Sequence, residues 1–114
     1  MKEIKAIIQP FMLTKVIEAL KQIEGMPGIT VDKDVRGFGG THTEATSKKI
    51  VDDMVEYVHK VKLETVVPEN MVDFVVMTIQ KYAHTGNPGD GKIFIYSIDD
   101  VVKVRTNERG EEAI

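Results

Sequence analysis

Residues 60–83 read KVKLETVVPENMVDFVVMTIQKYA and hold the two patterns that decide the fold. From Lys60 to Val67, polar and apolar side chains alternate and then reach an apolar pair, which is typical of a half-buried strand that Pro68 ends. Apolar residues then recur at helical spacing, at Val72, Val75, Val76, Ile79 and Ala83. The stretch therefore predicts a strand followed by a helix that packs on the sheet.

The flanking segments repeat this strand and helix pattern. Lys92 to Ile98 (KIFIYSI) is rich in β-forming residues and supplies a strand after the helix. Near the start of the chain, Lys2 to Gln9 alternates charged and apolar residues, so it also predicts a strand. From Leu13 the apolar spacing becomes helical, with Thr14 as the expected N-cap.

The order of elements defines the fold class. Ile29 to Arg36 is strand-like, but its Asp32-Lys33-Asp34 run predicts a bulge or an edge position. The order is then β-α-β, a loop and β-α-β, and Val101 to Arg105 adds a last strand-like segment. Such halves favour a ferredoxin-like βαββαβ sandwich, an α+β fold with both helices on one face of an antiparallel sheet. We expect one domain over residues 1–114.

The sheet face opposite the helices has no cover in this arrangement. We expect Ile, Val and Leu side chains on it, and such an apolar patch favours assembly of subunits over that face. The sequence therefore predicts a homo-oligomer. Between Thr41 and Asp53 there are few large apolar residues beyond Ile50 and Val51, which predicts a long exposed loop with a helical turn near its end.

Composition excludes several classes of function. The 114 residues contain no cysteine, which rules out thiol catalysis and cysteine-based metal sites. The net charge of −3 argues against a surface built for nucleic acid. No apolar run suits a membrane-spanning helix or a signal peptide, so we expect a cytoplasmic protein without membrane insertion. His42, His59 and His84 are too scattered for a zinc site, and no metal-binding residue is assigned.

A glycine-rich loop between the second helix and the following strand is the main candidate site. In Thr85-x-x-x-Gly89-Asp90-Gly91-Lys92, glycines let successive backbone N–H groups turn toward an anion, and the lysine adds a charge beside them. The order of elements is the reverse of that in a Walker A motif. An ordinary helix-to-strand turn is the alternative interpretation.

Two further cations strengthen the phosphate interpretation. Lys103 and Arg105 are two residues apart on a strand-like segment, so their side chains share a face and can converge on one polyanion. The alternative is a solvated edge paired with nearby acids such as Glu108.

These stretches resemble the PII signal-transduction family along essentially the whole chain. The segment from Thr85 to Ile98 matches that family's nucleotide-loop signature. Further landmarks are Ile7-Ile8-Gln9-Pro10-Phe11, Arg36-Gly37-Phe38-Gly39 and Arg105-Thr106-x-Glu108. The resemblance implies a trimer that binds ATP or ADP in clefts between subunits, senses 2-oxoglutarate when ATP and Mg²⁺ are present, and docks on partners through a long flexible loop, here residues 40–59.

The resemblance also assigns roles to residues by position. Phosphates would be held by Gly89, Asp90, Gly91 and Lys92, with Thr85 in the same loop and with Lys103 and Arg105 reaching across the subunit boundary. The purine side would be lined by Ile7, Thr30, Gly37, Phe38, Gly39, Glu64 and Val66. For 2-oxoglutarate the matching positions are Gly39, Gly40, Thr41 and Lys60. Two departures stand out: Lys103 replaces the usual arginine, and the loop lacks the glutamine that helps to hold magnesium.

The long loop differs from that of family members regulated by uridylylation. No tyrosine lies between Gly37 and Glu56, so uridylylation is predicted to be absent, and Tyr57 is assigned a packing role. A divergent loop on an intact nucleotide core resembles the nitrogen-fixation subgroup, which implies nitrogenase as the target. An ammonium transporter and glutamine synthetase are the alternatives. The oligomer would be a homotrimer or a heteromer with a paralogue.

Two other classes of function remain open at this point. A small phosphotransferase or ATP hydrolase would use the same phosphate loop, with Asp90 or His84 as the only nearby candidates for a base. A structural trimer without nucleotide would leave the glycine loop unexplained. No catalytic residue is assigned, because a regulatory ligand-binding protein is the preferred interpretation.

Overall fold

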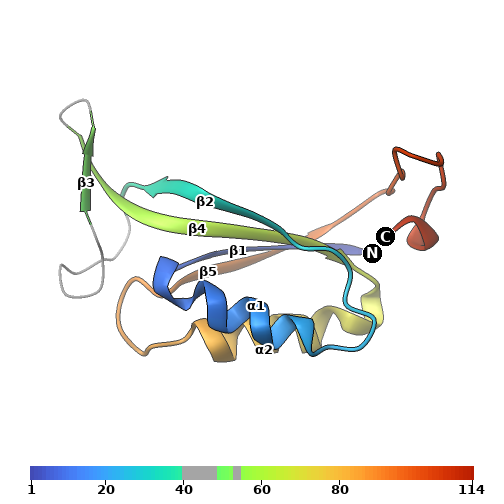
Figure 1. The fold of residues 1–114 in the computed structure, drawn as a ribbon, viewed down its shortest axis with the longest axis horizontal. Coiled ribbons are helices and arrows are strands. Elements are labelled where there is room, and N and C mark those ends of the chain that lie inside the picture. Colours follow the sequence, from blue (N-terminus) through green and yellow to red (C-terminus); the bar gives the residue numbers. More distant parts are fainter. Residues whose placement is uncertain (40–48, 53–54) are drawn as a thin grey trace.

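The computed structural model describes residues 1–39, 49–52 and 55–114 (Figure 1). The strands are β1 (Lys2–Ile8), β2 (Thr30–Gly37), β3 (Lys49–Asp52), β4 (Val55–Val67) and β5 (Gly91–Ser97). The helices are α1 (Leu13–Lys21) and α2 (Val72–Ala83). Short 3₁₀ turns are η1 (Pro10–Met12), η2 (Glu69–Met71) and η3 (Glu111–Ala113).

One antiparallel sheet organises the chain. Its strand order is β2-β4-β1-β5, and β3 pairs with the far end of β4. Both helices lie on the same side of the sheet, as Figure 1 shows. This is the predicted ferredoxin-like α+β arrangement, and the prediction of fold class is confirmed. In the described part of the chain, no helix is both long enough and apolar enough to cross a membrane.

The core lies between the sheet and the two helices. Alternation along β1 directs Ile4, Ala6 and Ile8 toward the helices, and all three are buried. They pack with apolar residues of β4 and of both helices, among them Leu63, Val67, Val16, Leu20, Val75 and Ile79. Burial of these side chains stabilises the fold by about 25 cal/mol for each Å² of apolar surface removed from water.

The opposite face of the sheet differs from our expectation. Residues directly across a ladder share a face, and the pairs Lys5 with Glu64 and Lys5 with Phe94 place charges and an aromatic ring there. The Lys5 ammonium lies 5.0 Å from the ring centroid of Tyr96. The prediction that Ile, Val and Leu side chains form an apolar patch on this face was wrong. These strands direct most of their aliphatic residues toward the helices.

Several element boundaries also differ from those predicted. Thr14 is not an N-cap, because η1 leads directly into α1 and places this residue within the first helical turn. The helical turn expected near residue 53 is replaced by β3, and β4 begins at Val55 rather than at Lys60. Within the predicted loop 40–59, residues 40–48 and 53–54 lie outside the described residues. The bulge predicted in β2 is confirmed by a register shift between Asp32 and Val35, and β2 is an edge strand.

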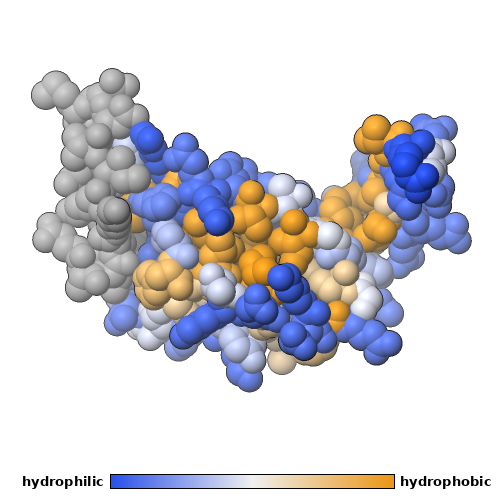
Figure 2. Space-filling view, in the orientation of Figure 1, coloured by the Kyte–Doolittle hydropathy of each residue, from blue (hydrophilic) through white to orange (hydrophobic). Residues whose placement is uncertain are grey.

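The predicted strand from Val101 to Arg105 was wrong. This segment forms one arm of a hairpin, in which Val102 pairs with Arg109 in a single bridge. The Lys103 N–H donates to the Glu108 carbonyl at 2.9 Å, and Asn107 turns the chain with a φ of +62°. The hairpin projects from the body at the C-terminal end, where Figure 2 also shows hydrophobic side chains (Figures 1 and 2).

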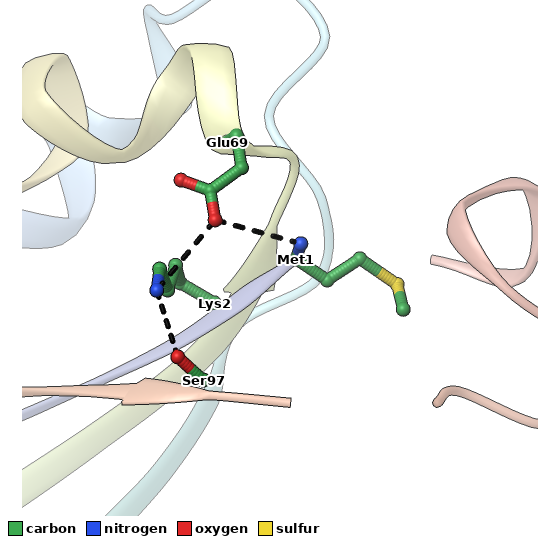
Figure 3. A network of polar contacts seen from close by, with 4 residues as sticks. All are labelled: Met1, Lys2, Glu69 and Ser97. Carbon is green, nitrogen blue, oxygen red and sulfur yellow. Dashed lines mark hydrogen bonds and ion pairs between the residues drawn. The ribbon is translucent and has the colours of Figure 1, made fainter. Parts of the chain in front are cut away.

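The N-terminus is tied to both neighbouring elements (Figure 3). The Met1 ammonium and the Lys2 ammonium lie 3.9 and 3.6 Å from one carboxylate oxygen of Glu69. Lys2 also donates to the Ser97 hydroxyl at 2.8 Å. The network joins the start of β1 to η2 and to the end of β5.

Candidate functional site

The loop that joins α2 to β5 is held by one aspartate. The backbone N–H groups of Thr85 and Gly86 donate to one carboxylate oxygen of Asp90, at 2.7 and 3.0 Å. The Thr85 hydroxyl donates to the other oxygen and accepts from the Asn87 N–H at 3.1 Å. Burial of Asp90 opposes its ionisation, but the hydrogen bonds from Thr85 and Gly86 outweigh it and hold the pKa of Asp90 below its usual value. The carboxylate therefore shapes the loop and is a weak base.

Close packing of the loop on β1 depends on a glycine. Gly91 has a φ of +106°, a conformation that L side chains rarely adopt. A Cβ atom at this position would lie 1.8 Å from the Ile7 carbonyl oxygen. Only glycine therefore lets the loop reach the end of β1, where β5 begins to pair with Ile8.

Lys60 links the loop to β4. Its ammonium donates a hydrogen bond to the Gly89 carbonyl. Burial lowers the pKa of Lys60 from its usual value, and the negative charge of Asp90 partly offsets this effect. A partly desolvated ammonium with one carbonyl partner retains hydrogen-bonding capacity for a ligand anion.

These features surround one open cavity of about 680 Å³. Nine of the residues that the sequence assigned to the site line it, and they are Ile7, Gly37, Phe38, Gly39, Lys60, Gly89, Asp90, Gly91 and Lys92. Two lysines, Lys60 and Lys92, are among the lining residues, and their positive charges make the cavity suited to an anion. Phe38, one of the lining residues, is 77% exposed. Its ring packs edge to face on the Tyr57 ring, with centroids 6.2 Å apart, so Tyr57 has the predicted packing role.

Two lining residues, Asn87 and Phe94, were missed. Asn87 occupies an unspecified position of the loop motif, so nothing in the pattern distinguished it. Phe94 lies two residues after Lys92 on β5, and strand alternation places the two side chains on one face. That alternation was a usable signal. Thr85 does not line the cavity and acts through Asp90 instead.

The remaining predicted residues lie elsewhere on the chain. Thr30, Glu64 and Val66 line a second cavity of about 350 Å³, together with the C-terminal residues Ala113 and Ile114. Among the residues that the structure describes, none lines both cavities. Thr30 pairs with Glu64 in the β2–β4 ladder, which fixes its register despite the bulge that follows.

Lys103 and Arg105 belong to the projecting hairpin. Lys103 lies 3.7 Å from the Glu108 carboxylate, the acidic partner considered in the alternative interpretation. Because the hairpin replaces the expected strand, alternation does not place these two side chains on one face. Gly40 and Thr41 lie outside the described residues. Within one chain, the predicted residues around the glycine loop therefore line one cavity. Thr30, Glu64 and Val66 line another, and Lys103 and Arg105 lie on the hairpin.

Comparisons with known proteins define the class. The family described as Nitrogen regulatory protein P-II matches residues 1–108. Over all 114 residues and the full length of each relative, the chain is 43% identical to nitrogen regulatory protein P-II of Rhodospirillum rubrum and 44% identical to P-II 1 of Escherichia coli. A crystal structure of Arabidopsis thaliana PII bound to citrate superposes with a TM-score of 0.79 at 42% identity, covering 99% of this chain and 91% of that one.

The fold and the glycine-loop cavity thus occur in a protein of the nitrogen-regulatory class. The chain belongs to the nitrogen regulatory protein P-II family, and the resemblance inferred from its sequence motifs is confirmed.

Proposed function

We propose that the protein is a nitrogen sensor that binds ATP or ADP, with Mg²⁺ accompanying ATP, in the cavity around the glycine loop. The observation that carries this proposal is the convergence of Gly37–Gly39, the loop from Gly89 to Lys92 and the Lys60 ammonium on one cavity. The lysine ammonium groups of Lys60 and Lys92 suit phosphates, and the exposed Phe38 ring suits a purine.

The second group of residues completes the site from a neighbouring copy. Thr30, Glu64 and Val66 lie around a separate cavity in one chain, and Lys103 and Arg105 lie on a projecting hairpin. A trimer explains both facts if each cleft takes the glycine loop from one subunit and these residues from the next. The charged face of the sheet, with Lys5 opposite Glu64, would then meet its neighbours through ion pairs. The assembly is a homotrimer or a heteromer with a paralogue.

The second effector in this proposal is 2-oxoglutarate. Lys60 supplies a cation to the lining of the cavity, which Gly39 also lines, and Gly40 and Thr41 follow Gly39 in the sequence. The Arabidopsis relative was solved with citrate, which supports the idea that a small polycarboxylate suits this class of protein. With no glutamine between residues 37 and 59, the magnesium ligand has to come from another group.

The output of the sensor is the long segment 40–59. Ligands shift its arrangement, and a cytoplasmic target protein binds only one arrangement. Nitrogenase is the target that we favour, with an ammonium transporter or glutamine synthetase as alternatives. No nucleic acid takes part, the protein does not insert into a membrane, and the loop is not uridylylated, because it has no tyrosine before Tyr57.

An enzyme of the phosphotransferase or ATP hydrolase type is the second candidate. It needs a base near the γ-phosphate, and Asp90 is engaged by Thr85 and Gly86 with its pKa held low by their hydrogen bonds. Equilibrium titration of ATP with Mg²⁺, followed by an assay for released phosphate, separates the two functions. Saturable binding without steady turnover supports the sensor, and turnover that Asp90→Asn abolishes supports the enzyme.

A further inference from the structure

Helix α2 presents large apolar side chains to solvent on the side away from the sheet. Phe74 is 60% exposed and Met77 is 67% exposed, whereas Val75 and Ile79 on the other side of the helix are fully buried. With about 3.6 residues per turn, Met77 lies at the centre of the exposed side. We define the α2 strip as Asp73, Phe74, Met77, Gln80 and Lys81, all of which are exposed.

The α2 strip borders a groove between the two helices. The groove has a volume of about 610 Å³, and Ala19, Gln22 and Ile23 form its wall on the α1 side. Tyr82 lies at its other side, with the Lys81 ammonium 5.3 Å from the ring centroid. Exposed aromatic and methionine side chains beside a groove are typical of surfaces that bind another protein segment.

The charges on the α2 strip indicate what that segment is. Asp73 lies in the first turn of α2 and Lys81 in its last turn, and each is four residues from Met77. If a second copy of α2 lies antiparallel, with Met77 against Met77, each Asp73 faces Lys81 of the other copy. Among the described residues Asp73 forms no ion pair, so its carboxylate is available for such a contact.

We propose that the α2 strip is a two-fold contact between copies of this chain. A two-fold contact uses the same patch on both partners, so it requires a patch that complements itself, and the α2 strip has opposite charges at equal distances from an apolar centre. The contact lies on the helix side of the sheet, opposite the face assigned to trimer formation (Figure 1). It therefore links trimers to one another, and it does not depend on the nucleotide-binding proposal. One pair of short helices buries little surface, so the association is weak and depends on concentration.

Sedimentation velocity of the full chain in low salt, from about 5 to about 500 µM, tests this contact at the weak affinities expected of small interfaces. The wild-type protein forms a larger species as the concentration rises, and Met77→Glu abolishes it. Each single variant, Asp73→Lys or Lys81→Asp, gives residues 73 and 81 the same charge. Because the contact contains this pair twice, each variant creates two repulsive pairs and weakens association about tenfold or more. The double variant Asp73→Lys with Lys81→Asp restores association to within about threefold of wild type, because it only exchanges the two charges.

Lys15→Asp is the matched control, since it reverses an exposed lysine on α1 outside the α2 strip and leaves the larger species unchanged. Circular dichroism of each variant checks that the helices remain folded. Two results overturn the proposal: a wild-type mass that stays constant over the whole range, or single variants that weaken association without recovery in the double variant. If the basic unit is not a trimer, the two-fold contact still joins two 12.8 kDa chains and doubles the sedimenting mass. This measurement involves no nucleotide, so it is separate from the test of the sensor function.

Discussion

The carboxylate of Asp90 accepts hydrogen bonds from both the backbone N–H and the hydroxyl of Thr85, five residues earlier in the chain. This pair closes the glycine loop through a backbone and a side-chain hydrogen bond. Preorganisation of this kind lowers the ordering cost of binding, so we expect Thr85 to have an indirect role in nucleotide affinity.

Substitution of Thr85 by valine tests that role. The β-branched shape is kept while the hydroxyl is lost, so Asp90 and the Asn87 N–H each lose a partner. We expect a loss of about 1–2 kcal/mol in the free energy of unfolding and about a tenfold weaker affinity for ATP. Denaturant unfolding and calorimetric titration measure the two effects. Thr85→Ser keeps the hydroxyl and should stay close to wild type; equal losses in both variants would contradict the hydrogen-bond explanation.

The Asp90 carboxylate also predicts a pH dependence of stability. Its folded-state pKa is lowered, so its contribution is present above the ordinary carboxyl pKa and is lost as the pH falls through the folded value. Asp90→Asn should therefore destabilise the protein at neutral pH and reduce its loss of stability in acid. Chemical unfolding at a series of pH values from about 7 to about 2 checks this, because that range includes the ordinary carboxyl pKa of about 3.9 and the lower values beneath it. Parallel pH curves for the two proteins would show that Asp90 is not the responsible group.

Gly91→Ala should be strongly destabilising. The new methyl group would overlap the Ile7 carbonyl and would also occupy a positive-φ position, so the start of the β1–β5 ladder has to move. We expect a loss of about 3 kcal/mol or more in the free energy of unfolding. Gly28→Ala is the matched control, because a Cβ atom there meets nothing within 4 Å. Similar unfolding curves for Gly91→Ala and wild type would contradict the close approach.

Lys60 should be needed for the response to 2-oxoglutarate more than for ATP itself. We expect Lys60→Gln to leave ATP affinity within about fivefold of wild type and to remove the enhancement by 2-oxoglutarate, because a carboxylate pairs only with the charged side chain. Burial lowers the pKa of Lys60 in the free protein, so the enhancement should fall at a lower alkaline pH than for an unperturbed lysine. Titration at several pH values measures both effects. Enhancement retained in Lys60→Gln would exclude this residue as the carboxylate partner.

The parts of the fold that followed from sequence are those in which local pattern and packing agree. The bounds of α2 could be predicted because Pro68 ends one strand and the apolar residues from Val72 onward keep a single helical face. β3 was not found because it is a strand of four residues whose place depends on pairing with β4. Likewise, Val102 and Val104 alternate with charges as a strand would, and only the turn at Asn107 makes them part of a hairpin.

The candidate site also has a part that could be predicted from the sequence and a part that could not. The glycine loop has a sequence signature because Gly91 and Asp90 are both required by its geometry. The separation of Glu64 from that loop has no such signature, since strand alternation gives the face of a residue and says nothing about which cavity it lines. The charged character of the sheet face without helices became clear only from the β1–β4 register, which places Lys5 opposite Glu64.

Calorimetric titration of ATP with Mg²⁺ into the protein, with and without excess 2-oxoglutarate, is the sharpest test of the proposed sensor function. We expect saturable ATP binding that becomes tighter in the presence of 2-oxoglutarate, because the Lys60 ammonium lies beside the glycine loop in the same cavity. The absence of ATP binding would contradict the nucleotide site itself. ATP binding that ignores 2-oxoglutarate would contradict the coupling and leave a sensor of adenine nucleotides alone.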